Sequence, residues 1–441
     1  MTKMKILIIS YHNPFNKGEA SILHAMIDAI NKTIPGAEFT ALSLHPEIDP
    51  IGRIAKVLPT IPPSCPGWRA KLKVVPLILQ RILWTMMYGV CKLNVDALVE
   101  PEVRRTLQAY AKADVIVSRG NDCFTDAHGI GIFLAHIYDH FLATMLNKKV
   151  VIYAQTIGPF KDNLMGSIFR FLTKIVLNRM ELITVRETIS EKILREMGVT
   201  RPAIYVTADS AFLLQPAPSK RVEEIMLREG VNKKCGGPVV GIVISTVYNY
   251  GFLPHVKSSK EKYRKYVKLM KEVVDYVASK LNATVVLLVH VSSPPTSTDY
   301  DKLLNRDVYQ LVKYKTKVKL INNEYTCQEL KGIIGQFDLL ISSRMHPIIH
   351  ALSMYVPVVG IGYTYKAKGI MKMVGLDRFV CDLKTLNVCE LTSKIGVSYS
   401  SRDKIRRDLR FRMRVIRERA MLNAKLLKDV TSAMKRNKWE C

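Results

Sequence analysis

The sequence of 441 residues lacks the cysteine patterns that mark zinc proteins. Its eight cysteines include no CxxC pair and no spacing typical of zinc ligands, so we predict no metal site. We also expect no secretion signal, because the charged start of the chain leads directly into an apolar strand. We therefore expect free thiols in a reducing compartment and a cytoplasmic protein.

Long hydrophobic runs are scarce as well. The most hydrophobic stretch, residues 74–90, is interrupted by Gln80 and Arg81 and is shorter than the roughly 20 apolar residues of a spanning helix. It therefore predicts no transmembrane segment. Two alternatives remain open: an amphipathic helix that lies at a bilayer interface beside basic residues, or an ordinary buried helix hairpin.

Acidic residues are few compared with basic ones. The chain has 38 Asp and Glu against 66 Lys and Arg, which gives a net charge of +28. This excess predicts attraction to an anionic partner such as nucleic acid, a phospholipid surface or a phosphorylated metabolite. Nucleic acid is the least expected, because the chain has no aromatic-studded basic strand and no recognisable reading module.

Short apolar strands alternate with helical patterns along the chain, which is typical of α/β proteins with parallel sheets. The length is too great for one ordinary core. We predict two Rossmann-like, doubly wound domains that face a cleft, at residues 1–228 and 229–400, and a basic helical tail at 401–441. A proline-rich stretch at 46–66 predicts a long surface connection. The expected strands are 5–10, 113–118, 150–154, 182–185, 204–207, 239–244, 284–289, 318–321, 339–341 and 357–361.

Each expected strand of the first domain ends in polar or glycine residues. Since the carboxyl ends of parallel strands meet at one edge of a sheet, these residues predict one continuous binding site. The candidate ligand-binding residues are Asn16, Lys17, Gly18, Arg119, Asn121, Asp122, Gln155, Gly158, Arg186 and Asp209. No GxGxxG follows the first strand, so a dinucleotide fingerprint is not predicted, and residues 16–18 either line a ligand site or form a plain structural turn.

The stretch at residues 337–375 reads as one βαβα unit of the second domain. After its first strand comes a turn with Arg344 and His346, and Pro347 is expected to begin the next helix. An arginine fork at a helix N-terminus suits a carboxylate or phosphate, and a histidine can move a proton near neutral pH. We predict an anionic substrate here. The structural alternative is that Arg344 caps a carbonyl and His346 is an interior histidine.

Three further residues follow strands of the second domain and are predicted to bind substrate. They are His290, Gly362 and Lys366.

Five ordered blocks resemble the polysaccharide pyruvyl transferase family. They are SRGNDCFTDAHG, YAQTIGPF, ITVRETISEKILREMGV, VTADSAFLL and ISSRMHPIIHALSMYVPVVGIGYTYKAKGIMKMVGL, and the similarity runs from Asn16 to about Asp382. The resemblance implies a fold similar to GT-B glycosyltransferases. It also implies transfer of a pyruvyl group from phosphoenolpyruvate to sugar hydroxyls, which gives a pyruvate ketal and phosphate.

The resemblance further implies roles for particular residues. Arg344 and His346 match the Arg-x-His turn of the family, and Arg186 matches its other arginine. Two arginines suit the carboxylate and phosphate of phosphoenolpyruvate, and His346 is the predicted acid or base. Phosphoenolpyruvate is a co-substrate in this scheme, with no cofactor and no metal. A nucleotide-sugar-dependent GT-B glycosyltransferase is the alternative.

Two positions depart from the family pattern, and both affect the expected partners. Ser118 and Arg119 stand where many members have a glycine-rich turn, and Ala20 follows Glu19 where an acidic pair is common.

The tail at 401–441 forms either a solvated helix or a basic patch that contacts anionic lipid or a polyanion. A lipid-linked saccharide acceptor at the inner face of the membrane would account for both the basic tail and residues 74–90.

Overall fold

The computed structural model describes residues 3–10, 13–60, 68–89, 91, 93, 95–233, 237–293, 299–362 and 365–437. The described residues divide into two compact units by their contacts. Unit 1 comprises Met1–Pro14, Ile22–Ser210 and Glu418–Cys441, and unit 2 comprises Phe15–Ser21 and Ala211–Arg417. Each unit is built on one parallel sheet.

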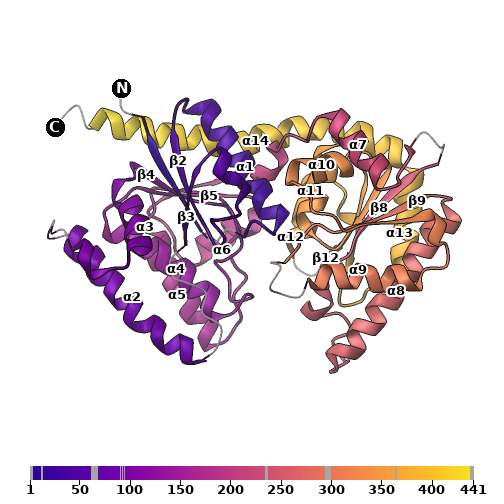
Figure 1. The fold of residues 1–441 in the computed structure, drawn as a ribbon, viewed down its shortest axis with the longest axis horizontal. Helices are drawn as coiled ribbons and strands as arrows, with labels where there is room; N and C mark the ends of the chain where they lie inside the picture. The colour runs from indigo at the N-terminus through magenta and orange to yellow at the C-terminus, as the bar shows by residue number, and fades with distance from the viewer. Residues whose placement is uncertain are drawn as a thin grey trace. The chain divides into compact units, whose positions relative to one another are not determined.

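The sheet of unit 1 has seven parallel strands in the order β3-β2-β1-β4-β5-β6-β7. The order reverses between β1 and β4, which is the topological switch of a doubly wound sheet. The central strands β4, β5 and β6 are buried along their whole length because helices cover both faces (Figure 1). The strands are β1 (Lys5–Ile9), β2 (Glu38–Ser43), β3 (Lys56–Pro59), β4 (Val115–Ser118), β5 (Val150–Gln155), β6 (Leu182–Val185) and β7 (Ala203–Val206).

Six helices connect these strands. The buried faces of α2 to α6 and the strands share one hydrophobic core, in which Trp84, Tyr110, Phe124 and Phe133 are the largest side chains with no exposure. The helices are α1 (Lys17–Thr33), α2 (Trp68–Gly89), α3 (Pro101–Lys112), α4 (Ile130–Met145), α5 (Leu164–Leu177) and α6 (Thr188–Glu196). The first turn of α1 belongs to unit 2, and the rest of the helix belongs to unit 1.

The sheet of unit 2 has six parallel strands in the order β10-β9-β8-β11-β12-β13. Its order reverses between β8 and β11, so the switch of this sheet lies where Ser342 ends β11. The strands are β8 (Val239–Val243), β9 (Thr284–Leu288), β10 (Val318–Ile321), β11 (Leu339–Ser342), β12 (Val358–Gly362) and β13 (Val380–Asp382). Two parallel doubly wound sheets were predicted from the sequence, and both are confirmed.

The helices of unit 2 begin before residue 229. Residues from Ala211 onward, including α7, group with unit 2, whereas the sequence assigned them to the first domain. The reason is that α7 packs on α10, where Val222 lies so close to Gly332 that no side chain fits there. The helices are α7 (Ser219–Arg228), α8 (Ser259–Lys280), α9 (Tyr300–Leu311), α10 (Cys327–Ile334), α11 (Met345–Ser353), α12 (Tyr365–Met373) and α13 (Val388–Ser400).

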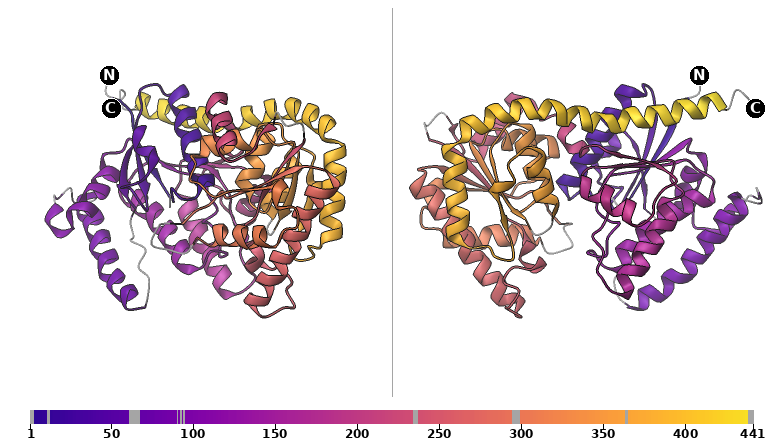
Figure 2. Two further views of the ribbon diagram at one scale, coloured as in Figure 1. Left: turned by 45° about the vertical axis from the view of Figure 1, so that its right-hand side comes forward. Right: turned by 180° about the vertical axis from the view of Figure 1, so that it is seen from behind.

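The predicted C-terminal helix is confirmed as α14 (Arg402–Asn437), one continuous helix in Figure 2. Its buried side chains recur at helical spacing and form one apolar stripe: Ile405, Leu409, Met413, Ile416, Ala420, Ala424 and Leu427. Residues to Arg417 group with unit 2, and residues from Glu418 group with unit 1. In unit 1, the buried Asn423 accepts hydrogen bonds from Thr184 and Thr207 at 2.5 and 2.8 Å.

Several local predictions were wrong. The stretch 46–66 is not only a surface connection, because it contains a 3-10 helix (Pro50–Arg53) and the edge strand β3. An edge strand tolerates the terminal Pro59 because its outer side needs no ladder hydrogen bond. Of the two alternatives left open for residues 74–90, the helix hairpin is wrong, because residues 68–89 form a single helix, α2. Among the described residues, no helix has both the length and the apolar character needed to cross a membrane.

Helix α11 begins two residues earlier than predicted. It starts at Met345, so His346 and Pro347 are its second and third residues, and Arg344 is the N-cap. Proline is tolerated at the third position because amides of the first turn have no intrahelical partner. His346 therefore lies within the first helical turn and not in a preceding loop.

Candidate functional site

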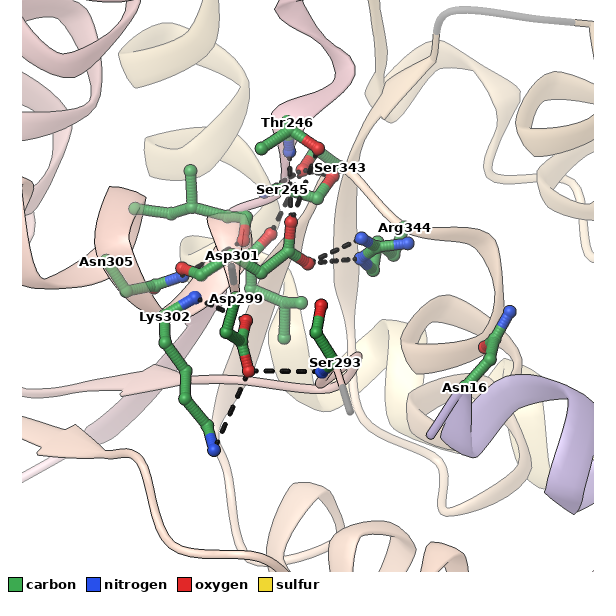
Figure 3. Close-up of polar contacts among 12 residues, drawn as sticks. Asn16, Ser245, Thr246, Ser293, Asp299, Asp301, Lys302, Asn305, Ser343 and Arg344 are labelled. Carbon is green, nitrogen blue, oxygen red and sulfur yellow. Dashed lines mark hydrogen bonds and ion pairs between the residues drawn. The ribbon is translucent and has the colours of Figure 1, made fainter. Parts of the chain in front are cut away.

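Hydroxyl groups join the carboxyl ends of β8 and β11 at the switch of the second sheet. The backbone amide of Ser245 donates to the Ser343 hydroxyl at 3.0 Å, and the two hydroxyl oxygens lie 2.8 Å apart. Figure 3 shows this pair beside Thr246, Asp301 and Arg344. Both serines are buried, so the pair fixes the start of the α11 turn.

The guanidinium of Arg344 is held by a carboxylate and not by a backbone carbonyl. Its Nε and Nη2 donate to Oδ2 of Asp301 at 2.8 and 2.5 Å, as Figure 3 shows. Asp301 is buried in the first turn of α9, whereas 26% of the Arg344 side chain is exposed. Its Nη1 group has no hydrogen-bond partner among the described residues. Asp301 thus orients a cation with one donor group left for a ligand.

Three histidines of unit 2 lie close together. His350 follows His346 by one helical turn, and its Nε2 lies 2.8 Å from the Ser21 hydroxyl. The His290 ring, which follows β9, lies 5.3 Å from the His350 ring between centroids. Side chains four residues apart share one face of a helix, so His346 and His350 are on the same side of α11.

His290 is buried, and neither of its ring nitrogens has a hydrogen-bond partner in the described part of the chain. Burial lowers its pKa well below 6.5, and electrostatic interactions with the nearby ionisable groups His346, Arg344 and Lys17 lower it further. Burial also lowers the pKa of His350 well below the ordinary value. Both imidazoles are therefore neutral at pH 7. A neutral imidazole offers one donor and one acceptor to a ligand.

The residues 16–18 form a hydrogen-bonded turn in unit 2 that also carries a cation. Asn16 forms an isolated antiparallel β-bridge with Val291. Its side-chain amide donates to Glu19 at 2.8 Å, and its side-chain oxygen accepts from the backbone amide of Gly18 at 3.1 Å. The Lys17 ammonium lies 3.4 Å from a Glu324 carboxylate oxygen. Lys17, the first residue of α1, therefore lies in the same unit as Arg344 and His290.

Glu324 is shared between two lysines. Lys302 lies 2.8 Å from Oε1 of Glu324, and Lys17 lies near the other oxygen. Burial alone would raise the pKa of Glu324, but the bond to Lys302 and the charge of Lys17 give a net lowering. Glu324 is therefore ionised at neutral pH and partly balances the two ammonium groups.

Gly18 is a position where only glycine fits. A Cβ built on Gly18 would lie 2.2 Å from Nδ1 of His346. We expect Gly18→Ala to push the His346 ring away and to lower the free energy of unfolding by about 1–3 kcal/mol, the usual cost of overpacking. Urea denaturation measures this loss.

The matched control is Gly131→Ala, which also changes the second residue of a helix. No atom lies within 4 Å of a Cβ built at Gly131, so alanine is expected to be neutral or to stabilise α4 by up to about 1 kcal/mol. Equal effects of the two substitutions would contradict the close contact between Gly18 and His346.

In unit 1, the predicted residues Arg186 and Asp209 form a buried ion pair. Nη1 of Arg186 lies 2.6 Å from Oδ2 of Asp209, Nε donates to the Thr156 hydroxyl at 2.7 Å, and the side chains are 2% and 1% exposed. Burial alone would lower the pKa of Arg186, but the charges of Asp209 and Glu187 raise it. These intrachain contacts occupy two of the guanidinium nitrogens.

The other predicted residues of unit 1 lie at the ends of β4 and β5. The backbone amide of Asn121 donates to the Gln155 side chain at 3.2 Å, and the Gln155 amide donates back to the Asn121 side chain. Asp122 pairs with His128 at 3.2 Å. Arg119 is buried, and Gly158 has a φ of +69°, a backbone conformation that favours glycine. The structure thus joins Asn121 directly to Gln155, and Arg186 to Asp209.

Two further predicted residues lie on β12, which pairs with β11, and on the helix that follows it. Gly362 ends β12, and Lys366 is the second residue of α12.

Sequence reasoning missed Asp301, the Ser245–Ser343 pair, His350 and Glu324. The four-residue spacing of His346 and His350 was a signal in the sequence. No local pattern links Asp301 to Arg344, which is 43 residues away. Within the described ranges, no group of three or more His, Cys, Asp or Glu residues could hold a metal ion.

Comparison with known proteins places this geometry in a wider context. The family model described as "Polysaccharide pyruvyl transferase" matches residues 16–365. The chain is 21% identical over 443 residues to the amylovoran biosynthesis protein AmsJ of Erwinia amylovora, an alignment that covers 98% of this chain and 100% of AmsJ.

Solved structures share the fold at low identity. A glycosyltransferase from Rickettsia africae has a TM-score of 0.56 and 12% identity, over 98% of this chain and 99% of that chain. The UDP-GlcNAc 2-epimerase from Neisseria meningitidis has a TM-score of 0.57 and 12% identity, over 98% and 100% of the two chains. These similarities confirm the predicted GT-B-like fold.

Proposed function

The chain belongs to the polysaccharide pyruvyl transferase family, and from this premise we propose that it transfers a pyruvyl group from phosphoenolpyruvate to hydroxyls of a saccharide. The observation that carries the proposal is the first turn of α11, where Arg344 and His346 lie at the switch of the second sheet. Ligands of open α/β sheets bind at this place. The product is a pyruvate ketal, and phosphate is released.

Phosphoenolpyruvate is a small trianion, and unit 2 offers cations for it. Arg344 has its Nη1 donor available, Lys17 adds an ammonium, and the N-terminus of α11 adds partial positive charge. His290, neutral and buried, can donate one hydrogen bond to a carboxylate or phosphate oxygen. We assign the donor site to these residues.

The reaction needs proton transfers that an imidazole can perform. The first hydroxyl oxygen bonds to C2 of phosphoenolpyruvate while C3 takes a proton and becomes a methyl group. The second hydroxyl oxygen then bonds to C2, and the bond from C2 to the phosphate oxygen breaks. Of the two hydroxyl protons, one is balanced by the proton gained at C3 and the other leaves with phosphate. We assign His346 as the acid or base.

The polar residues of unit 1 are our candidates for the acceptor site. Asn121, Asp122 and Gln155 offer amide and carboxylate groups suited to sugar hydroxyls. Arg119 lies where many family members have glycine, which favours an acceptor with its own anionic group. Such an acceptor, linked to lipid at the inner face of the membrane, would agree with a cytoplasmic enzyme.

The test is thermal stability with phosphoenolpyruvate, because a ligand of the folded state raises the melting temperature. We expect stabilisation by about 2.7 kcal/mol at a concentration of about 100 times Kd, and no shift in Arg344→Ala. Arg406→Ala is the matched control, since Arg406 pairs with Asp338 at 2.8 Å and is 29% exposed. This control should keep the shift.

Two results would contradict the proposal. One is an equal phosphoenolpyruvate shift in Arg344→Ala and the native chain, which would place the donor elsewhere. The other is a shift with UDP and none with phosphoenolpyruvate, which would favour a nucleotide-sugar-dependent glycosyltransferase on the same fold.

A further inference from the structure

Glu324 follows β10 in unit 2, and its carboxylate lies among donors from three separate segments of the chain. Oε1 accepts a hydrogen bond from the Lys302 ammonium at 2.8 Å, and Oε2 accepts one from the Ser292 hydroxyl at 3.1 Å. The Lys17 ammonium lies 3.4 Å from Oε2. One carboxylate thus contacts two cations and a hydroxyl that belong to α9, to α1 and to the residues after β9.

The carboxylate is held more loosely than the donors around it. The Glu324 side chain is 52% exposed, whereas Lys17 is 16% exposed and Ser292 is buried. The backbone amide of Ser292 donates to the Phe15 carbonyl at 3.1 Å, and Lys302 lies in the first turn of α9. A half-exposed side chain can rotate into solvent while donors fixed by the backbone stay in place.

A cavity of about 10 Å³ lies beside these groups, and it is lined by both lysines, Ser292, Glu324 and His290. This volume is at the lower limit for one water molecule and is too small for a tetrahedral oxyanion. His290 is buried, and neither of its ring nitrogens has a hydrogen-bond partner among the described residues. Because an unsatisfied buried polar group is costly, the imidazole indicates a polar ligand for this cavity.

Asp299 is the other carboxylate near Lys302, but the backbone holds it in place. Its Oδ1 accepts from the Lys302 amide at 3.1 Å as the N-cap of α9, and its Oδ2 accepts from the Ser293 amide at 3.3 Å. Oδ2 also lies 3.6 Å from the Lys302 ammonium. Figure 3 shows Asp299 and Lys302 beside Asp301. Of the two carboxylates at Lys302, Glu324 is therefore the one that can leave.

We propose that this cavity is a phosphate subsite, and that the Glu324 carboxylate occupies the place of the phosphate group until a ligand displaces it. The donors for the phosphate are the two ammonium groups, the Ser292 hydroxyl and one imidazole N–H. Lysine is a usual phosphate ligand, and phosphate oxygens accept from all of these donors. For its ligand, phosphoenolpyruvate, the inference rests on the proposed function.

The subsite divides the two anionic groups of phosphoenolpyruvate between neighbouring residues of α9. Asp301 orients the Arg344 guanidinium, and Lys302 is the next residue along the chain. The phosphate enters between the lysines, which leaves Arg344 for the planar carboxylate. When Glu324 returns to the lysines, it competes with the released orthophosphate and favours its departure.

The experiment is isothermal titration calorimetry of the full chain with orthophosphate and with phosphoenolpyruvate. Glu324→Gln keeps the shape of the side chain and removes its charge. It is expected to bind orthophosphate at least about fivefold more tightly than the native chain, because anions about 4 Å apart repel each other even in water. Lys302→Met lacks one ammonium and should bind at least about fivefold more weakly. The affinity for phosphoenolpyruvate should change in the same two directions.

The matched controls come from another lysine and glutamate pair of unit 2. Lys394 lies 2.8 Å from Glu390, with side chains that are 26% and 34% exposed. Glu390→Gln and Lys394→Met remove the same groups and should leave both affinities unchanged. A gain of affinity in Glu324→Gln cannot result from misfolding, so this variant tests the inference even if Lys302→Met is unstable.

Three results would overturn the subsite. They are no orthophosphate binding by either the native chain or Glu324→Gln, an affinity of Glu324→Gln no higher than that of the native chain, and full affinity in Lys302→Met. If phosphoenolpyruvate binds through Arg344 while both variants keep the native affinities, the proposed function stands and the subsite is wrong. If orthophosphate follows the expected pattern and phosphoenolpyruvate does not bind, the subsite stands and the proposed donor is wrong.

Discussion

Replacing His346 with glutamine is expected to lower kcat for pyruvyl transfer by about 10²–10⁴-fold, the range of a general acid or base. Glutamine keeps a polar side chain in the first turn of α11 but cannot take or give a proton near pH 7. Because Arg344 and Lys17 are unchanged, the thermal shift with phosphoenolpyruvate should persist. Steady-state kinetics and the thermal shift, measured on the same sample, separate chemistry from binding.

The control for this substitution is His255→Gln, an exposed histidine of unit 2 that precedes α8. It should keep the native kcat. A kcat of His346→Gln within about threefold of the native value would remove His346 from the proton transfer. The neutral His290, which is buried nearby, would then be the next residue to test.

Replacing Arg186 with alanine is expected to destabilise unit 1 by about 3–5 kcal/mol, the cost of leaving a buried charge without its partner. Asp209 has almost no exposure, so water cannot replace the guanidinium. The Thr156 hydroxyl would lose its donor as well. Chemical denaturation followed by circular dichroism measures the loss.

Two further variants identify the cause. Arg195→Ala removes an exposed arginine paired with Glu191 at 2.8 Å and should change stability by no more than about 1 kcal/mol. The double variant Arg186→Met/Asp209→Leu removes both charges and should recover much of the stability. A double variant no more stable than Arg186→Ala would show that the buried charge is not the reason for the loss.

The central strands that were predicted from the sequence share a physical property. The apolar runs of β5, β6 and β11 are buried on both faces, so their composition alone marks them. In contrast, β2 and β3 lie at or next to the edge of the first sheet and carry Glu38 and Lys56. Their mixed composition does not differ from that of a loop, and β13 is only three residues long.

The candidate site was predicted in part for a similar reason. Arg344, His346 and His290 follow apolar strands directly, so the order of the sheet brings them to one edge. Asp301 is different, because its contact with Arg344 depends on the position of α9 against β8 and β11. Helix position is set by packing over the whole unit, and no nearby sequence pattern records it.

The path of the chain has a consequence for how this protein could change by recombination. The helices α1 and α14 each run from one unit into the other. Residues 15–21 belong to unit 2, whereas the rest of α1 belongs to unit 1. Residues 418–437 belong to unit 1, whereas the first part of α14 belongs to unit 2. A gene segment for residues 211–417 would omit Lys17 and Gly18, and a segment for residues 1–210 would omit Asn423 and its bonds to Thr184 and Thr207. Neither unit is therefore a portable module. New substrate specificities are expected to arise by point substitution and loop variation, and not by exchange of whole halves between genes.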